Sequence, residues 1–427
     1  MSKKLALFGG EPVIKKNFNP FNTIDEIEVE AVSKVVKSGI LSGFIGAAGD
    51  AFLGGPEVQK FEKKAQSYFG VKHAISVNSW TSGLIAAVGA IGIEPGDEVI
   101  TSPWTMSATA MSILHWNAIP VFADIDKETY NICPSEVRRK ITKKTKAILS
   151  VDIFGQSADT DSLMKIAKEY DLKVISDSAQ APGTYYKNKY TSTDVDIGGF
   201  SFNYHKHIHC GEGGVLVTND DKLANKMRLI RNHAESVINE DIENENLANM
   251  IGYNFRLGEI EAVIASAQLD KLKANVLSRQ RAANQLTKAI KDLPGLKTPF
   301  INKDCTHAYY VYAFQIDKEV TGVSKDKIFS ALKLEGVPAL MSKYQNIHLL
   351  PIFQKKIAYG SKNFPWSMSQ DYKKISYTKG ICPVAEKMQD EKMLGISLCM
   401  HEFSEKEIDL VSMAFRKVWD NLDHLKQ

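Results

Sequence analysis

The sequence has few cysteines, and none of them forms a recognisable pair. Five cysteines are scattered over 427 residues, and none belongs to a Cys-x-x-Cys motif. This pattern argues against a disulfide framework and a zinc ribbon, and it fits the reducing environment of the cytoplasm. We therefore expect a cytoplasmic protein without structural disulfides.

Long hydrophobic runs are also missing. No apolar run approaches the roughly 20 residues that a bilayer-spanning helix needs. Near the N-terminus, a short apolar run ends at Gly9, Gly10 and Pro12, and it is too short for the hydrophobic region of a signal peptide. The sequence predicts neither a membrane span nor a signal peptide.

The charge is nearly balanced. Lysine and arginine number 53, aspartate and glutamate number 50, and the formal net charge is +3. No block of five or more basic residues occurs, which argues against a dedicated nucleic-acid surface. With 44% hydrophobic and 24% charged residues, the composition is that of an ordinary globular protein. The length predicts two or three domains of roughly 100–200 residues.

Strand-like and helix-like segments alternate through the first half of the chain. The predicted strands are 74–77, 99–102, 119–122, 147–151 and 173–176. Strand–helix–strand units in series predict a parallel sheet with helices on both faces, and ligands bind at the carboxyl ends of such strands. Polar or aromatic residues follow three of these strands directly, at 78–82, 104–106 and 177–180.

Capping signals and periodic apolar residues indicate further helices. Thr23 is the expected cap of a helix from residue 24 to 37, whose apolar residues share one face. Two long helices are expected at 256–272 and 277–293. Ser404 and Glu407 form a capping box before a final amphipathic helix.

One lysine lies beside a glycine-rich turn between two predicted strands. Lys206 follows the apolar run 197–202, and three glycines at 211, 213 and 214 precede the next strand. A loop lysine is most often simply solvated. A lysine in this position is also a candidate for a Schiff base with an aldehyde.

Asp177 ends a predicted strand, where a carboxylate can cap a helix, bind a metal or take part in catalysis. Pyridoxal phosphate needs a lysine for its aldehyde and a carboxylate that keeps its pyridine nitrogen protonated, so Asp177 and Lys206 together suggest this cofactor. The cofactor's phosphate needs backbone N–H groups at a helix N-terminus and nearby hydroxyls. Such hydroxyls occur at Ser79, Thr81, Ser82 and Ser201.

Three histidines, at positions 205, 207 and 209, alternate along the lysine loop. They could ligate a metal if the loop were extended, but histidines that pack beside a binding pocket are more common. We expect no metal site.

The sequence as a whole resembles the DegT/StrS family of pyridoxal phosphate-dependent sugar aminotransferases. Its motifs follow the family's order over nearly the whole chain: LALFGGEPV, NSWTSGLIAAVGAIGIEPGDEVI, SPWTMSATAMSILHWNAIPVFADID, SDSAQAPG, SFNYHKHIHCGEGGVLVTND, GYNFRLGEIEAVIASAQLDKL and CPVAEK. Lys206 lies 29 residues after Asp177, and Gln180 and Ser201 lie 3 and 24 residues after it, as in the family.

The resemblance implies an α/β fold of the aspartate-aminotransferase type. It implies a large cofactor-binding domain at residues 1–272, with a mostly parallel seven-stranded sheet flanked by helices and an N-terminal arm. A smaller C-terminal α+β domain is expected at residues 273–427. The implied cofactor is pyridoxal 5'-phosphate, with pyridoxamine phosphate as an intermediate form.

The resemblance also implies site residues. Lys206 matches the lysine that binds the cofactor, Asp177 the partner of the pyridinium nitrogen, and Gln180 the residue beside the ring hydroxyl. Phosphate contacts match Trp80, Thr81 and Ser201. Asn254 matches an asparagine that reaches the phosphate of the other subunit, which implies a homodimer with shared active sites; the alternative is that Asn254 caps its own helix.

Two positions depart from the family pattern. Trp80 stands where the family often has glycine or alanine, and its indole is expected to point towards the sugar pocket. Met106 stands where an aromatic residue usually stacks on the cofactor ring; either Met106 packs on the ring or Trp104 supplies the stacking.

The resemblance implies transfer of an amino group from glutamate or glutamine to a keto sugar, usually nucleotide-linked, in the biosynthesis of surface polysaccharide or a related glycoconjugate. A keto-cyclitol is the alternative acceptor. Two other activities remain open: a sugar dehydratase, which would carry histidine at the position of Lys206, and a regulator that binds the cofactor without turnover.

Overall fold

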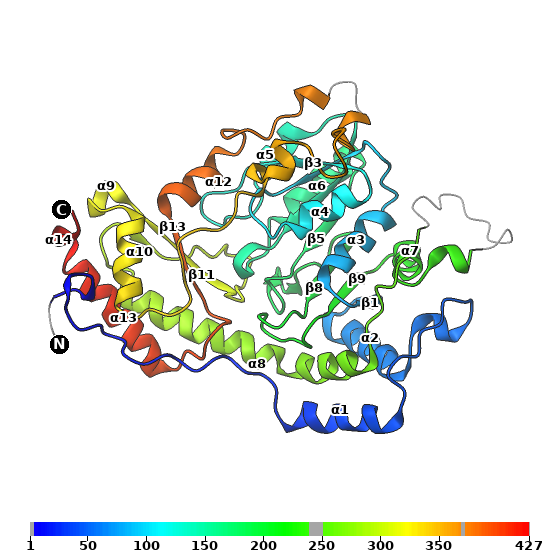
Figure 1. The fold of residues 1–427 in the computed structure, drawn as a ribbon, viewed down its shortest axis with the longest axis horizontal. Helices are drawn as coiled ribbons and strands as arrows, with labels where there is room; N and C mark the ends of the chain where they lie inside the picture. The colour runs from blue at the N-terminus through cyan, green and yellow to red at the C-terminus, as the bar shows by residue number, and fades with distance from the viewer. Residues whose placement is uncertain (1–3, 239–250, 369–371, 427) are drawn as a thin grey trace.

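The computed structural model describes residues 4–238, 251–368 and 372–426. Two β-sheets pack on one long helix, α8 (Glu259–Ile290), which runs beneath both of them (Figure 1). The first part of α8 contacts the larger sheet, and its last turns contact the smaller one. This helix therefore sets the position of the two sheets relative to each other.

The larger sheet has seven strands in the order β1-β9-β8-β5-β4-β2-β3. They are β1 (His73–Val77), β2 (Glu98–Thr101), β3 (Ile119–Phe122), β4 (Thr145–Val151), β5 (Lys173–Asp177), β8 (Ile197–Ser201) and β9 (Gly214–Thr218). From β3 to β8 neighbouring strands run parallel, whereas β9 is antiparallel to both β1 and β8. The predicted mostly parallel seven-stranded sheet is confirmed.

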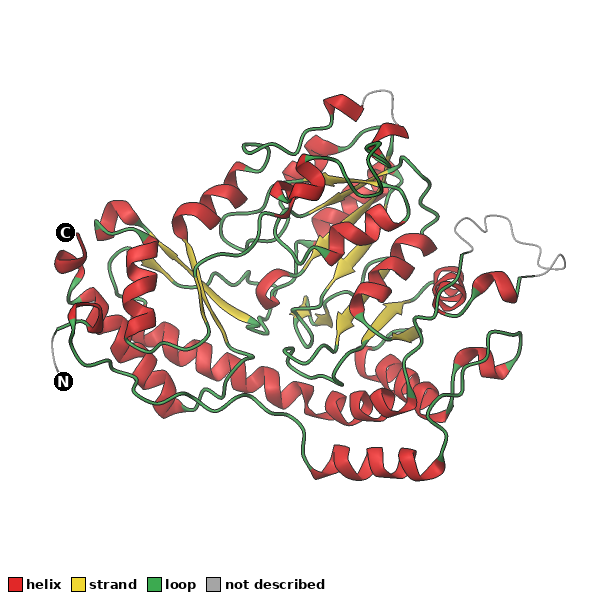
Figure 2. Ribbon diagram, viewed as in Figure 1, coloured by secondary structure: helices red, strands yellow, loops and turns green. Residues whose placement is uncertain are grey.

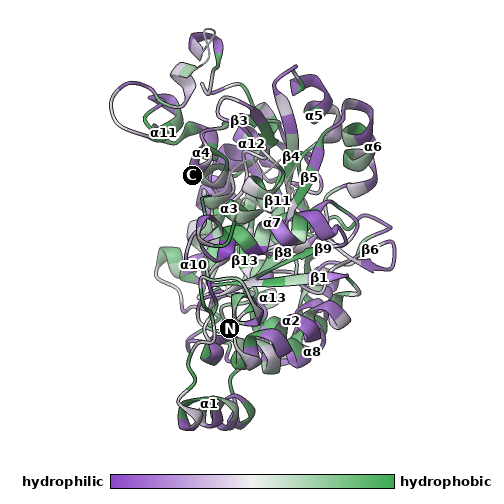
Figure 3. Ribbon diagram, turned by 90° about the vertical axis from the view of Figure 1, so that its right-hand side faces the viewer, coloured by the Kyte–Doolittle hydropathy of each residue, from purple (hydrophilic) through white to green (hydrophobic). Residues whose placement is uncertain are grey.

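Helices cover both faces of this sheet (Figure 2). One face packs against α3 (Trp80–Ala90), α4 (Ala108–His115) and α7 (Asp221–Arg231). The other face packs against α2 (Pro56–Phe69), α5 (Pro134–Lys140), α6 (Thr160–Tyr170) and α8. Figure 3 shows β5 mainly green and the outer helix α5 mainly purple, as expected for a strand buried on both faces.

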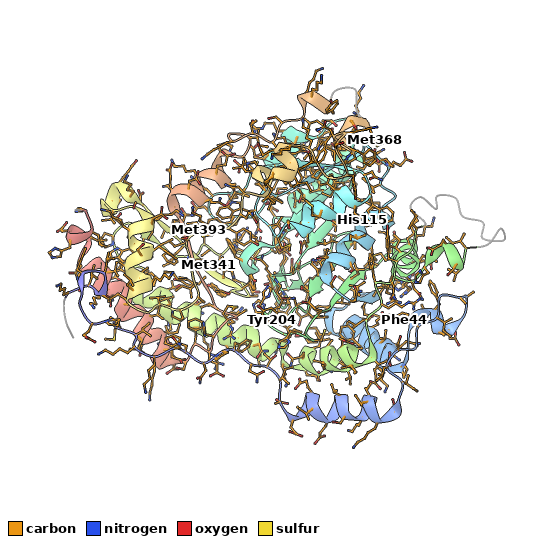
Figure 4. The ribbon with its side chains drawn as sticks, in the orientation of Figure 1. Phe44, His115, Tyr204, Met341, Met368 and Met393 are labelled. Atoms are coloured by element: carbon orange, nitrogen blue, oxygen red, sulfur yellow. The ribbon has the colours of Figure 1, made fainter. Side chains whose placement is uncertain are left out.

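The smaller sheet has four strands, all antiparallel, in the order β10-β11-β13-β12. They are β10 (Leu296–Lys297), β11 (Val311–Ile316), β12 (Leu340–Met341) and β13 (Met393–Ser397), and Met341 and Met393 are labelled in Figure 4. A core of buried apolar residues joins this sheet to α8, α10 (Lys325–Leu334) and α13 (Glu405–Trp419). The predicted capping box at Ser404 and Glu407 begins α13 and is confirmed.

The prediction of two long helices at 256–272 and 277–293 is wrong. A single helix, α8, continues through residues 272 and 273 without interruption. None of the residues between the two predicted segments is glycine or proline, so the sequence offers no strong breaker there. The division into domains at 272 and 273 stays a prediction.

The predicted cap of the first helix is also wrong. Helix α1 (Glu26–Ser38) begins after Asp25, whose side chain forms a capping box with Glu28. Thr23 instead donates a hydrogen bond to Gln268 of α8 at 2.6 Å. The apolar residues of this helix are unequally buried, because Val35 is 6% exposed and Ile27 is 61% exposed.

The sequence between α7 and α8 is acidic and irregular, which predicts a loop. A short 3-10 helix, Ala234–Ser236, lies at its start, and residues 239–250 lie outside the described residues. Within the residues that the structure describes, no helix is both long and apolar enough to cross a membrane.

Candidate active site

The loop between β8 and β9 carries Lys206 into the protein interior. The backbone N–H of Lys206 donates to the carbonyl of Asn203 at 3.0 Å, and Gly211 adopts a positive φ of 85° that favours glycine. Tyr204, labelled in Figure 4, lies on this loop and is 63% exposed, whereas Lys206 is only 8% exposed. Lys206 is therefore not a solvated loop lysine.

Burial makes the neutral form of Lys206 easier to reach than it is for a lysine in water. The Nζ atom of Lys206 lies 4.3 Å from the centre of the Tyr310 ring, which is contributed by the segment just before β11. Burial lowers the pKa of Lys206 to about 8, although the negative charge of Asp177 opposes the shift. A neutral amine is the form that attacks an aldehyde, so this lysine is suited to forming a Schiff base near neutral pH.

Asp177 is the last residue of β5 and is almost fully buried. Its Oδ1 accepts hydrogen bonds from Trp80 Nε1 at 2.7 Å and from the Ala179 N–H at 3.2 Å, and its Oδ2 accepts one from Thr109 Oγ1 at 2.8 Å. Burial raises the pKa of Asp177, and the bonds from Thr109 and Trp80, together with the charge of Lys206, oppose this rise. No α-helix follows β5 directly, so Asp177 is not a helix cap.

The indole of Trp80 points into the protein and not towards a sugar pocket, so that expectation is wrong. Trp80 is 6% exposed, and its ring fills a slot between Gly83 of α3 and Gly199 of β8. A Cβ on Gly199 would lie 2.3 Å from the ring, and one on Gly83 would lie 2.8 Å from it. The two glycines therefore make room for the indole under Asp177.

The N-terminus of α3 and the end of β8 meet at Gly214. Ser201 pairs with Gly214 across the β8–β9 ladder, and a Cβ on Gly214 would lie 3.0 Å from the backbone nitrogen of Trp80. Ser79 caps α3 through its side chain, and Thr81 is exposed in the first turn. This combination of free helix N–H groups and hydroxyls is chemically suited to a phosphate.

Gln180 lies three residues after Asp177, and both the oxygen and the nitrogen of its side-chain amide form hydrogen bonds. Its Oε1 accepts from the Phe154 N–H at 2.8 Å, and its Nε2 donates to Tyr344 Oη at 2.9 Å. Only one of its two N–H donors is used in these bonds, so the other can bind a ring hydroxyl.

The structure separates the two candidates for packing on the cofactor ring. Trp104 is fully buried, donates to Asn346 Oδ1 at 2.6 Å and stacks on Tyr130. Met106 is 62% exposed just before α4. Of the two, only Met106 has a surface that can contact a ligand.

Asn254 lies beside Asn78, two residues before Trp80 at the start of α3. It is exposed, forms a bridge with Asn232, and accepts a hydrogen bond from Asn78 through its backbone carbonyl at 3.3 Å. Helix α8 has Gly258 at its N-cap position, so Asn254 does not cap it. The capping alternative is therefore wrong.

Burial keeps two of the three alternating histidines in the neutral form. His207 is fully buried, and its Nε2 lies 2.8 Å from the carbonyl oxygen of Ala308. Burial lowers the pKa of His207 to about 3 and that of His205 to about 4, so both are neutral near pH 7. Among the described residues, no group of three histidine, cysteine, aspartate or glutamate side chains could hold a metal ion.

Three side chains near the site were missed in the sequence. Tyr310 directly precedes β11, and Tyr344 lies three residues after β12 (Leu340–Met341). Thr109 lies in the first turn of α4, three residues after Met106, and that spacing places both near one end of the helix. Of these three side chains, only Thr109 had a signal in the sequence, which is its helical spacing from Met106.

Together these groups fit pyridoxal phosphate. The site offers a buried lysine with a lowered pKa and a buried carboxylate, Asp177, that has three donors. An ionised carboxylate has about four acceptor positions, so one remains for a ring N–H. The junction at Gly214 offers the hydroxyls and N–H groups that a phosphate needs.

The sequence is similar to known sugar-pathway proteins. It is 36% identical over 362 residues to the spore coat polysaccharide biosynthesis protein SpsC of Bacillus subtilis, with 83% of this chain and 90% of the relative covered. It is 33% identical over 295 residues to GDP-perosamine synthase of Caulobacter vibrioides, with 69% of this chain and 78% of the relative covered.

The fold is similar to that of a solved aminotransferase. Helicobacter pylori PseC, an aminotransferase involved in the biosynthesis of pseudoaminic acid, superposes with a TM-score of 0.78 at 27% identity. The match covers 95% of this chain and all of that one. A model of the DegT/DnrJ/EryC1/StrS aminotransferase family matches residues 25–397. The chain therefore belongs to this family of pyridoxal phosphate-dependent sugar aminotransferases.

Proposed function

We propose that the protein transfers an amino group from glutamate or glutamine to a nucleotide-linked keto sugar, with Lys206 as the catalytic residue. The observation that carries this proposal is the pairing of a buried lysine of lowered pKa with a buried, hydrogen-bonded carboxylate at the end of β5. Burial lowers the pKa of Lys206, and the positive charge of Lys206 opposes the rise that burial causes in the pKa of Asp177.

Each proposed residue has a separate task. Bound pyridoxal phosphate would supply an electron sink for the substrate carbon. Asp177 would hold a proton on the ring nitrogen, and Gln180 would donate to the ring hydroxyl. Lys206 Nζ would bind the aldehyde and then move a proton between substrate carbon and cofactor carbon. Trp80 and Thr81, through their N–H groups, and Ser201 would hold the phosphate, with Met106 packed on the ring.

The acceptor is proposed from the relatives. GDP-perosamine synthase is named for a nucleotide-linked amino sugar, and SpsC is a polysaccharide biosynthesis protein. We propose that the enzyme makes an amino sugar for a surface polysaccharide or related glycoconjugate, and that it works in the cytoplasm. A free keto-cyclitol is the alternative acceptor, and the same assay tests it.

We also propose a homodimer with shared sites. Asn254 is exposed and its side chain is not needed to cap α8, so it is free to reach a phosphate in a second subunit. Exposed apolar side chains lie on α1 and on the glycine-rich segment that follows it: Ile27, Val36, Ile40, Leu41 and Ile45. Such a cluster on one side of a protein is typical of a protein interface, and a two-fold dimer makes each contact reciprocal.

The other two activities have less support. A dehydratase of this family would carry histidine where Lys206 stands, and His207 is enclosed against the Ala308 carbonyl. A regulator without turnover does not need a lysine of lowered pKa beside Asp177.

The test is a half-reaction followed by acceptor screening. The purified protein, loaded with pyridoxal phosphate, is mixed with glutamate or with glutamine, and its absorbance is followed from ~330 to 420 nm, where the aldehyde and amine forms of the cofactor differ. Conversion to the amine form, and return on adding a keto sugar nucleotide, supports the proposal. If the cofactor returns to the aldehyde form only with a keto-cyclitol, the acceptor is a keto-cyclitol and not a keto sugar nucleotide. If neither donor converts the cofactor to the amine form, the proposal is contradicted.

A further inference from the structure

The indole of Trp80 has no role in phosphate binding, because only the backbone of this residue lies at the N-terminus of α3. Its Nε1 instead donates to Asp177 Oδ1 at 2.7 Å, inside the core that joins α3 to the sheet. We propose that Trp80 is a positioning residue, which orients the Asp177 carboxylate and keeps it ionised for the ring nitrogen of the cofactor. This inference rests on the proposed role of Asp177.

The slot around the indole is the first support. Gly83 and Gly199 come from different elements, and a side chain on either would collide with the ring of Trp80. Gly199 forms part of β8, where a glycine weakens the strand interior. The strand therefore accepts a less favourable residue at the place where the indole passes beneath Asp177.

The donor count is the second support. Trp80 Nε1, Thr109 Oγ1 and the Ala179 N–H together fill three of the roughly four acceptor positions of the Asp177 carboxylate. Both oxygens are held, so the carboxylate plane is fixed before any ligand binds. The free position can then face only one direction, which preorganises the bond to the ring nitrogen.

The chemistry of the donor is the third support. An indole N–H can only donate, and it binds an ionised carboxylate more strongly than a neutral carboxyl group. Thr109 can both donate and accept, and it also shares a hydrogen bond of 2.7 Å with Thr105. Burial raises the pKa of Asp177, and the hydrogen bonds from Thr109 and Trp80 both oppose this rise; of the two donors, only Trp80 cannot turn to accept a hydrogen bond from a protonated carboxyl.

The experiment compares two ligands that differ at one atom. Cofactor-free protein is titrated with pyridoxal phosphate and with its carbocyclic analogue, in which a C–H group replaces the ring nitrogen. The ratio of the two dissociation constants measures the bond between Asp177 and the ring nitrogen. The wild-type protein should prefer pyridoxal phosphate by about tenfold or more, as expected for a hydrogen bond to a charged group.

Trp80→Phe keeps an aromatic ring but removes the donor, and we expect it to reduce this ratio at least threefold. Trp419→Phe is the matched control, because Trp419 is similarly buried and donates to the Pro294 carbonyl at 2.9 Å, away from the site. The control should keep the wild-type ratio. If Trp80→Phe does not fold, as judged by its circular dichroism, the same ratio is measured with 3-benzothienylalanine at position 80, which replaces the N–H by sulfur at nearly the same volume.

The outcomes separate this inference from the proposed function. A wild-type protein without preference between the two ligands contradicts the pairing of Asp177 with the ring nitrogen, and the inference falls with it. A wild-type preference that survives the loss of the indole N–H overturns the inference alone. Equal weakening of both ligands also overturns it, because that result means that the indole serves only to hold the phosphate end of α3 in place.

Discussion

Replacing Lys206 by methionine should stabilise the cofactor-free protein at neutral pH. Burial lowers the pKa of Lys206 from 10.5 to about 8 in the folded state, a difference of about 2.5 units. At about 1.4 kcal/mol for each unit, a charged Lys206 costs the folded state about 3 kcal/mol. Methionine has a similar length and carries no charge, so the variant avoids this cost.

The gain should depend on pH in a defined direction. Between pH 8 and 10.5 the unfolded lysine binds a proton that the folded one has released, so the unfolding free energy of the wild-type protein rises with pH in this window. The advantage of Lys206→Met is therefore full below about pH 8 and fades as the pH approaches 10.5. For a chain of 427 residues, about 3 kcal/mol corresponds to a rise of about 3 °C in Tm.

The assay is thermal unfolding of the cofactor-free proteins at pH 7 and pH 10, by circular dichroism. Lys222→Met serves as the control, because Lys222 is exposed on α7. A variant that is less stable than the wild type at pH 7 would refute the reasoning. So would a gain of equal size at both pH values, since that result would come from packing and not from the buried charge.

Three further predictions concern the same site. Asp177→Asn should keep the Tm of the cofactor-free protein within about 2 °C, because an amide can accept a hydrogen bond from Trp80 and donate one to Thr109. The same variant should bind the cofactor about tenfold more weakly or worse in an absorbance titration. An unchanged cofactor affinity would count against the pairing of Asp177 with the ring nitrogen. Lys206→Ala should lose at least about a hundredfold in turnover in a coupled donor assay, and a variant that retains more than about one per cent would show that another group moves the proton. Mixing Lys206→Ala with Asn254→Trp should restore part of the activity, because one site of each mixed dimer then carries neither change; no recovery from dimers shown by native mass spectrometry to be mixed would mean that each subunit builds its own site.

The parallel sheet could be predicted because its strands are short, apolar and separated by helices. The carboxyl ends of these strands then bring Asp177, Ser201 and the first turn of α3 to one edge of the sheet, as the structure shows. The capping box of α13 was predictable because Ser404 and Glu407 act within one turn. Local signals of this kind survive in the folded protein because tertiary contacts do not compete with them.

Other features depend on contacts that the sequence does not display. Thr23 was a reasonable cap, but a hydrogen bond to Gln268 takes its hydroxyl, and Asp25 caps α1 instead. The direction of the Trp80 indole depends on glycines in two other segments, and no local pattern links those glycines to the tryptophan. Tyr310 reaches Lys206 only because the smaller sheet packs beside the lysine loop.

The most direct test of the central claim is to locate the lysine that carries the cofactor. The wild-type protein is loaded with pyridoxal phosphate, reduced with borohydride to fix the link between the lysine amine and the cofactor's aldehyde, digested, and mapped by mass spectrometry. The account predicts one modified peptide, which contains Lys206, and no such peptide from Lys206→Ala. Attachment to another lysine, or no specific attachment in a folded protein that has bound the cofactor, would contradict the account.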